Sequence, residues 1–207
     1  MTGRGPRISN IKEDLLAHLF DHRHVAKLDD PERLSYQDPA RLIPLIRSYE
    51  HGDAAEIGTG SGYFFFPLCE FLSGRGTCHA IELQPEIIEH FESERIKRSR
   101  DLHVRTIVGT KDRIDLPNGS ISLVWMANVY HELSHPREMI GEVFRILEPA
   151  GQFFVIDWKK EETPVGPPGD ERASEVSLYD LLIDAGFTRI RSHDLYPYHY
   201  VVEALTD

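Results

Sequence analysis

Residues 56–62, Glu56-Ile57-Gly58-Thr59-Gly60-Ser61-Gly62, carry the strongest structural signal in this chain of 207 residues. A short apolar run precedes them, and the aromatic run Tyr63–Phe66 follows. Twenty residues past Gly62, a second apolar run ends in an acid, Glu82. This order predicts a strand, a glycine loop, a helix and a second strand that ends in a carboxylate, as in an α/β sheet that holds a nucleoside-bearing ligand.

Each part of this pattern has a physical reason. Glycine tolerates positive φ and lets the backbone approach a ligand closely. The helix that follows opens with unpaired N–H groups, which suit an anion. A carboxylate at the tip of the next strand accepts hydrogen bonds from ribose hydroxyls. The pattern therefore predicts a nucleoside-bearing ligand, and the plainer alternative is an ordinary tight turn between strand and helix.

A pyrophosphate-bearing dinucleotide fits poorly, because its fingerprint is Gly-x-Gly-x-x-Gly. Counted from Gly58, the sixth position is Tyr63, and counted from Gly60 it is Phe65.

Composition limits the class of protein. The chain is 41% hydrophobic and 28% charged with a net charge of −11, as expected for one globular domain that is not a nucleic-acid binder. Its two cysteines, Cys69 and Cys78, form no metal or redox motif and indicate buried thiols in a reducing cytosol. The sequence contains no apolar run near 18 residues, so we expect no membrane span and a cytoplasmic location.

Apolar periodicity predicts alternating strands and helices after an N-terminal part. A capping box at Asn10 and Glu13 predicts a first helix that ends near residue 21, followed by an irregular segment to Gln37. Another helix is expected after Asp38-Pro39, kinked by Pro44. Strands are expected at 54–57, 77–82, 102–108, 121–128, 152–157, 188–193 and 199–204, with helices at 61–72, from 85, from 136 and at 177–185.

These units predict a doubly wound, mostly parallel α/β sheet. The connection 194–197 is too short for a crossover, so the last two strands should pair antiparallel. Ligands of such sheets bind at the carboxyl ends of the strands, where residues 58–62, Glu82, the 109–112 loop and Asn128 are expected.

The string Glu-x-Gly-x-Gly-x-Gly resembles motif I of class I S-adenosylmethionine-dependent methyltransferases. Residues 115–122 are similar to the "LPFPDGSFD" segment of the small-molecule type related to ubiquinone and menaquinone biosynthesis, and residues 145–151 to its "RVLKPGG". The resemblance covers about residues 40–205. It implies a Rossmann-like seven-stranded sheet of order 3-2-1-4-5-7-6 with strand 7 antiparallel. We therefore expect a methyltransferase domain at 38–207, preceded by an N-terminal helix and lid segment at 1–37.

The resemblance further implies S-adenosylmethionine as the cofactor. Glu56 would orient the loop or the methionine amino group, Glu82 would hold the ribose, Leu83 would pack on adenine and Asn128 would face the donor. After the third strand the family often has Gly-Asp-Ala, where this chain has Gly109-Thr110-Lys111-Asp112, so Asp112 or Thr110 would meet the adenine amino group. The expected cofactor-binding residues are Glu56, Gly58, Thr59, Gly60, Gly62, Glu82, Leu83, Lys111, Asp112 and Asn128.

A second motif, His131-Glu132-Leu133-Ser134-His135, matches the zinc-protease string His-Glu-x-x-His. That chemistry needs both histidines on one helix, but Pro136 follows His135 and disfavours helix there, so we expect no metal. His131 is instead a candidate catalytic base for an acceptor hydroxyl or amine, and simple packing in the loop is the equal alternative.

The predicted function is in-line methyl transfer to a small-molecule acceptor, with the N-terminal segment and the Trp158–Arg172 loop as lids. The alternative is a non-catalytic protein that binds the same cofactor on the same fold, and a zinc hydrolase ranks last.

Overall fold

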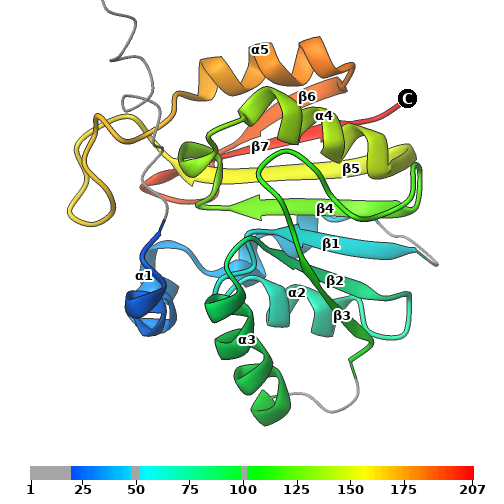
Figure 1. The fold of residues 1–207 in the computed structure, drawn as a ribbon. Coiled ribbons are helices and arrows are strands. Elements are labelled where there is room, and N and C mark those ends of the chain that lie inside the picture. The colour runs from blue at the N-terminus through cyan, green and yellow to red at the C-terminus, as the bar shows by residue number, and fades with distance from the viewer. Residues whose placement is uncertain (1–19, 48–51, 99–101) are drawn as a thin grey trace, which may run out of the picture.

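A seven-stranded sheet of order β3-β2-β1-β4-β5-β7-β6 organises the chain in this computed structural model, which describes residues 20–47, 52–98 and 102–207 (Figure 1). The predicted order and the mostly parallel arrangement are confirmed. The strands are β1 (Asp53–Ile57), β2 (Cys78–Glu82), β3 (Val104–Val108), β4 (Ile121–Ala127), β5 (Leu147–Trp158), β6 (Thr188–His193) and β7 (His199–Leu205).

The strand order creates a switch point between β1 and β4. β3, β2, β1, β4 and β5 are parallel, whereas β7 pairs antiparallel with both β5 and β6. After β1 the chain crosses to β2 on one side, while β4 lies on the other side of β1. The crevice at the carboxyl ends of β1 and β4 is therefore the place where such a sheet binds a ligand.

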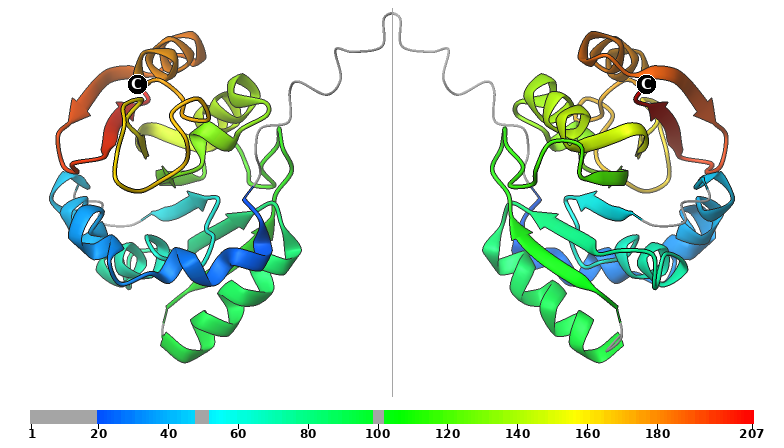
Figure 2. Two further views of the ribbon diagram at one scale, coloured as in Figure 1. Left: turned by 90° about the vertical axis from the view of Figure 1, so that its left-hand side faces the viewer. Right: turned by 90° about the vertical axis from the view of Figure 1, so that its right-hand side faces the viewer.

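Helices cover both faces of the sheet (Figures 1 and 2). On one face lie α2 (Phe65–Phe71), α3 (Pro85–Arg98) and the 3₁₀ turns η2 (Pro39–Arg41) and η3 (Ile43–Leu45), and on the other lie α4 (Pro136–Ile146) and α5 (Glu175–Ala185). These helices pack through apolar faces. On α4 the buried face consists of residues at helical spacing, Met139, Ile140, Val143 and Ile146. Each layer buries its own apolar cluster against the sheet.

The structure corrects two expected helices and leaves a third untested. The helix that leads from the glycine loop begins at Phe65 rather than at residue 61, because Gly62 has φ +87° and cannot belong to an α-helix. The helix expected after Asp38 is two short 3₁₀ turns, since Pro44 lacks the N–H that an α-helix requires. The helix expected from residue 10 lies outside the described residues, apart from its last positions.

The segment expected to be irregular contains two short helices, η1 (His22–Asp29) and α1 (Arg33–Tyr36). The Asp21 carboxylate caps η1 by accepting the Arg23 N–H at 3.0 Å. The prediction was wrong here because short helices are stabilised by contacts with the rest of the chain, such as that between η1 and α3.

β5 begins earlier than predicted, at Leu147, and passes through Pro149–Gly151. Its pairing with β4 breaks after Leu147 and becomes regular only from Gln152, the residue at which the strand was expected to start.

Cys69 and Cys78 are both free and buried. Within the described residues, none of the helices combines the length and apolarity needed to cross a membrane.

Candidate functional site

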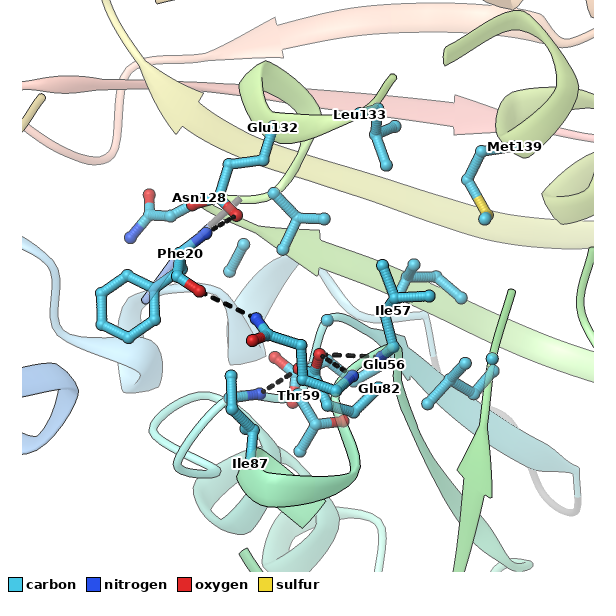
Figure 3. Close-up of a pocket in the computed structure, with 18 of the residues that line it drawn as sticks. Phe20, Glu56, Ile57, Thr59, Glu82, Ile87, Asn128, Glu132, Leu133 and Met139 are labelled. Carbon is cyan, nitrogen blue, oxygen red and sulfur yellow. Dashed lines mark hydrogen bonds between the residues drawn. The ribbon is translucent and has the colours of Figure 1, made fainter. Parts of the chain in front are cut away.

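A cavity opens at the carboxyl ends of the first four strands (Figure 3). Its walls come from the loops after β1, β2, β3 and β4, and the N-terminal segment adds Phe20, Leu28 and Arg33. Phe20 bridges the cavity, because its N–H donates to Glu132 Oε2 at 3.1 Å and its carbonyl accepts from Gln84 Nε2 at 2.9 Å. The N-terminal segment thus ties the β2 side of the cavity to the β4 side.

The glycine loop forms the floor. Gly58 has φ +70°, and its N–H donates to the Ile81 carbonyl at 2.8 Å. A Cβ at this position would lie 2.4 Å from Val129 Cγ2, so only glycine lets the loop pack against the chain that leaves β4. Gly62 lies behind the loop, against the Phe66 ring, and does not line the cavity.

Glu82 stands at the tip of β2 and is 8% exposed. Its Oε1 accepts the N–H groups of Leu83 at 2.8 Å and Gln84 at 3.1 Å, and its Oε2 accepts the Gly60 N–H at 3.2 Å. Burial raises the pKa of this carboxyl, while the three N–H groups oppose the rise. The carboxylate is therefore fixed in direction, and Oε2 keeps a lone pair free for a ligand.

Glu56 and its neighbours leave polar atoms unsatisfied. Within the described part of the chain, Glu56 Oε2, Thr59 Oγ1 and Ser61 Oγ are buried without a hydrogen-bond partner, and all three residues line the cavity. Burial raises the pKa of the Glu56 carboxyl well above its usual value, although the nearby Trp125 side chain lowers it. Buried polar groups normally have partners, so these three atoms indicate a polar ligand.

Arg33 lines the cavity with its cationic side chain and is itself buried, with a relative exposure of 8%. Its guanidinium lies 3.9 Å from the Tyr63 ring centroid and donates to Gln37 Oε1 at 3.0 Å. Burial lowers its pKa, and nearby groups including Glu56 raise it. Sequence reasoning missed Arg33, because a single arginine in a polar segment has no local pattern that marks it.

Gln37 and Asn128 form a reciprocal amide pair across 91 positions of sequence. Gln37 Nε2 donates to Asn128 Oδ1 at 3.0 Å, and Asn128 Nδ2 donates to Gln37 Oε1 at 3.0 Å. Asn128 has φ +59° and follows β4 directly. The pair fastens the end of the N-terminal segment to the rim of the cavity.

The loop that follows β4 carries a buried pair of a histidine and a carboxylate. His131 Nδ1 lies 2.7 Å from Asp157 Oδ1, and the His131 N–H donates to Asp157 Oδ2 at 3.0 Å. His131 belongs to the 3₁₀ turn η4 (Tyr130–Glu132), whereas His135 precedes α4 and is exposed. The two histidines of the motif therefore do not share a helix, as predicted. Among the described residues no cluster of three or more His, Cys, Asp or Glu could hold a metal ion.

Comparisons with known proteins identify this architecture. Residues 55–155 match the family described as "Methyltransferase domain". A SAM-dependent methyltransferase from Aquifex aeolicus superposes with a TM-score of 0.85 at 31% identity, covering 91% of this chain and 100% of that one. The chain belongs to the S-adenosylmethionine-dependent methyltransferases.

Two other relatives of this methyltransferase are more distant. An uncharacterized methyltransferase, YcgJ of Bacillus subtilis (strain 168), is 24% identical over 110 residues, which span 53% of this chain but only 42% of YcgJ. The [4+2]-cyclase SpnF shares the fold with a TM-score of 0.65 at 16% identity, covering 76% of this chain and 75% of that one. Because a protein named for a cyclisation has this fold, the fold alone does not fix the reaction.

S-adenosylmethionine is the cofactor of this methyltransferase family, and most of the predicted cofactor residues line the cavity. Those that do are Glu56, Gly58, Thr59, Gly60, Glu82, Leu83, Lys111 and Asn128. Gly62, Asp112 and His131 do not line it. Asp112 accepts instead from Thr110 Oγ1 at 3.0 Å, and Thr110 itself faces the cavity.

The two expected lids differ in their relation to this cavity. The described part of the N-terminal segment, from Phe20 on, covers it. The loop that ends at Arg172 adds no residue to its lining within the described chain, although it lies at the same edge of the sheet (Figure 1). Arg172 folds that loop on itself by donating to the carbonyls of Lys159 at 3.0 Å and Pro167 at 2.9 Å.

Proposed function

We propose that this chain transfers a methyl group from S-adenosylmethionine to a small-molecule acceptor by in-line displacement. The observation that carries the proposal is one Glu56 carboxylate oxygen that has no partner among the described residues and is buried in the same cavity as the fixed carboxylate of Glu82. A ligand with a cationic end and a sugar satisfies both groups. The resemblance to the small-molecule type of ubiquinone and menaquinone biosynthesis remains a prediction about the acceptor.

Glu82 is proposed to hold the ribose. Its two oxygens already accept three N–H groups from Gly60, Leu83 and Gln84, which aim the carboxylate and leave capacity for hydroxyl donors. Leu83, next to it, offers an apolar side chain to the adenine. Thr110 and Lys111 line the far wall, and we propose that they, with Asp112 behind them, contact the base.

Glu56 and Arg33 are proposed to recognise the amino-acid end. This end carries an ammonium and a carboxylate, and the cavity provides one buried carboxylate and one buried guanidinium of complementary sign. The Thr59 and Ser61 hydroxyls, buried without partners among the described residues, supply further hydrogen bonds. These groups fit the cofactor that family membership assigns.

The chemistry then requires little of the protein. S-adenosylmethionine supplies, when bound, a methyl group on a sulfonium that leaves as a neutral thioether. The residues of the chain orient the two reactants and exclude water, which is the main contribution that a displacement of this kind needs. Asn128, held by Gln37, faces the cavity from the β4 side and is proposed to lie beside the reacting groups.

A small acceptor agrees with the closure of the cavity. Phe20 spans it, and the Gln37–Asn128 pair fastens the segment that carries Arg33. A covered site of this kind suits an acceptor that can be enclosed. The absence of nucleic-acid acceptors remains a prediction that rests on the net charge of −11.

Calorimetry with S-adenosylhomocysteine tests the proposal. Glu82→Ala removes the ribose acceptor, so the affinity should fall about 10- to 100-fold, as expected for hydrogen bonds to a charged group. Glu86→Ala makes the same charge change at an exposed position of α3 and should leave the affinity unchanged. Equal affinities of wild type and Glu82→Ala would refute the ribose assignment.

Turnover separates the enzyme from a protein that only binds the cofactor. Wild-type protein incubated with radiolabelled S-adenosylmethionine and a panel of small amines, phenols and carboxylic acids should label one class. Tight binding of S-adenosylhomocysteine without labelling of any acceptor would favour the non-catalytic alternative.

A further inference from the structure

A third carboxylate lines the cavity besides Glu56 and Glu82. It belongs to Glu132, at the end of η4, and its side chain is 19% exposed. Figure 3 shows Glu132 entering the cavity from the β4 side, opposite Glu82 and Thr59. Of the cofactor residues proposed above, Glu82 and Thr59 lie on the opposite wall and Asn128 lies on the same side as Glu132.

A buried dyad stands behind Glu132. Asp157 is 1% exposed and accepts three N–H donors: the backbone and Nδ1 of His131, and the backbone of Trp158 at 2.7 Å. These contacts fix the His131 ring with a proton on Nδ1, so that Nε2 is directed toward Glu132 Oε1, 3.8 Å away. Asp157, His131 and Glu132 thus form a line of groups from the core to the cavity.

Glu132 and His131 have shifted pKa values that suit the exchange of a proton between them. Burial raises the pKa of Glu132 to about 7, with nearby Asp157 and Glu82 adding to the rise, and His131 and the Phe20 N–H opposing it. Burial disfavours the charged His131, but Asp157, Glu132 and Glu171 together raise its pKa above the ordinary 6.5. Groups with pKa values near neutrality act well as general bases.

We propose that Glu132, supported by His131 and Asp157, accepts a proton from the methyl acceptor, and that the acceptor is a small amine which enters as its ammonium. This inference rests on the proposed function. Glu132 is the residue that touches the acceptor, His131 relays the proton, and Asp157 positions His131.

The charges of this wall favour an amine. While His131 is neutral and can accept a proton on Nε2, the ionised Glu132 places a negative charge at the acceptor end. The other lining residues that flank it in sequence, Asn128, Val129, Leu133 and Ser134, carry no cation that would attract an acidic acceptor. A carboxylate or phosphate ester would meet repulsion there, whereas an ammonium would be attracted.

The proton step is balanced. An ammonium has no lone pair with which to attack, so one N–H bond must break first. The electron pair stays on nitrogen, the proton forms an O–H bond on Glu132 and passes on to His131 Nε2, and nothing is oxidised or reduced. The free amine then has the lone pair that attack on a methyl group requires.

Glu132→Gln removes the base and keeps the shape. We expect methylation of the accepted amine to fall at least about 100-fold, as for loss of a general base. Affinity for S-adenosylhomocysteine should stay within about 2-fold of wild type, because glutamine keeps an oxygen that can accept the Phe20 N–H and the side chain lies opposite Glu82. Glu132→Asp, which retains a carboxylate, should keep more activity than Glu132→Gln. Glu138→Gln makes the same charge change at an exposed position of α4 and should behave as wild type.

Two readouts distinguish this role from a structural one. The wild-type rate should rise with pH through about 7, and this dependence should be lost in Glu132→Gln. Nitrogen NMR of labelled histidine should show the His131 titration midpoint lower in Glu132→Gln than in wild type, since a favourable negative charge is gone. The NMR measurement needs neither cofactor nor acceptor.

The outcomes separate the proposals. If wild-type protein fails to bind S-adenosylhomocysteine, the proposed function is wrong. If it binds S-adenosylhomocysteine but methylates only phenols or carboxylic acids, or nothing in the panel, the amine proposal is overturned. Unchanged amine turnover in Glu132→Gln, or an unmoved His131 midpoint, would overturn the role of Glu132.

Discussion

Gly58 shows at the scale of one residue how the loop and the sheet depend on each other. It has φ +70°, and the site of a Cβ is filled by Val129 from the chain that leaves β4. The same glycine therefore lets the loop turn and lets the two walls of the cavity meet. A side chain here would disturb both the turn and the contact.

Gly58→Ala should lower the free energy of unfolding by about 2–5 kcal/mol, the sum of a left-handed backbone penalty of about 1–2 kcal/mol and overpacking of about 1–3 kcal/mol. Gly74→Ala is the matched control, because Gly74 has φ +78° with nothing within 4 Å of the added Cβ. The Gly74→Ala variant should lose only the part of the free energy of unfolding that comes from the left-handed backbone. Urea denaturation measures both, and equal losses would show that the contact with Val129 contributes nothing.

Sequence reasoning at this scale succeeded where the signal is local. Gly58 and Glu82 belong to one short pattern whose spacing reflects a strand, a turn and a strand, so both were placed at the cavity. Arg33 and Glu132 were not identified as lining residues. Their position depends on contacts between segments far apart, such as the bond from Phe20 to Glu132 across 112 positions.

At the scale of an element, the crossover from β3 to β4 has no helix in the structure and is held by α4 instead. Arg145 donates to the carbonyls of Leu116 and Ile114, both at 2.9 Å, and pairs with Glu142 at 2.7 Å. Glu142 Oε2 in turn accepts the Ile114 N–H at 3.0 Å. One turn of α4 therefore satisfies the backbone of a loop whose first residues line the cavity.

Arg145→Met should lower the free energy of unfolding by about 2–3 kcal/mol, because it leaves carbonyls and Glu142 without their partner. Hydrogen exchange should accelerate in residues 110–118. The control is Arg137→Met on the same helix, whose ion pair with Asp184 is 65% and 53% exposed and should contribute less than about 1 kcal/mol. Similar exchange in the two variants would contradict the role assigned to Arg145.

Helices and strands with a clear apolar pattern were predicted more accurately from the sequence than elements without one. The strands lie within a few residues of their predicted positions, because each is a buried apolar run bounded by turn residues. The early start of β5 at Leu147 and the late start of α2 at Phe65 were missed, since both depend on backbone geometry at Ala150 and Gly62 that periodicity does not report. The short helices of residues 22–45 carry too little periodicity to be recognised.

At the scale of the whole molecule, strand order came from a family resemblance and not from the residues alone. Alternating units predict a doubly wound sheet but leave its order open. The N-terminal segment was expected as a lid, and the structure adds the residues through which it closes the cavity, namely Phe20, Arg33 and Gln37. The sheet therefore positions most of the proposed cofactor residues, and the N-terminal segment completes the site.

The response of the whole fold to acid depends on a buried histidine beside this site. His199 is fully buried, and within the described chain neither ring nitrogen has a hydrogen-bond partner. Its ring stacks on Tyr36 at 6.2 Å and lies 4.0 Å from the Trp158 ring. Burial, reinforced by the positive charges of Arg33 and other cations, lowers its pKa from 6.5 to about 3.

This shift fixes the sign of a pH effect. Between pH 6.5 and about 3 the unfolded chain protonates His199 and the folded protein does not, so the histidine costs stability as the pH falls. The cost grows by up to about 1.4 kcal/mol per pH unit. His199→Leu removes it, and the stability of this variant relative to wild type should rise steadily from pH 7 to pH 4 in urea denaturation. His103→Leu, which removes an exposed imidazole, is the matched control over the same range. A constant difference for His199→Leu would mean that the folded protein protonates this ring as readily as the unfolded chain does.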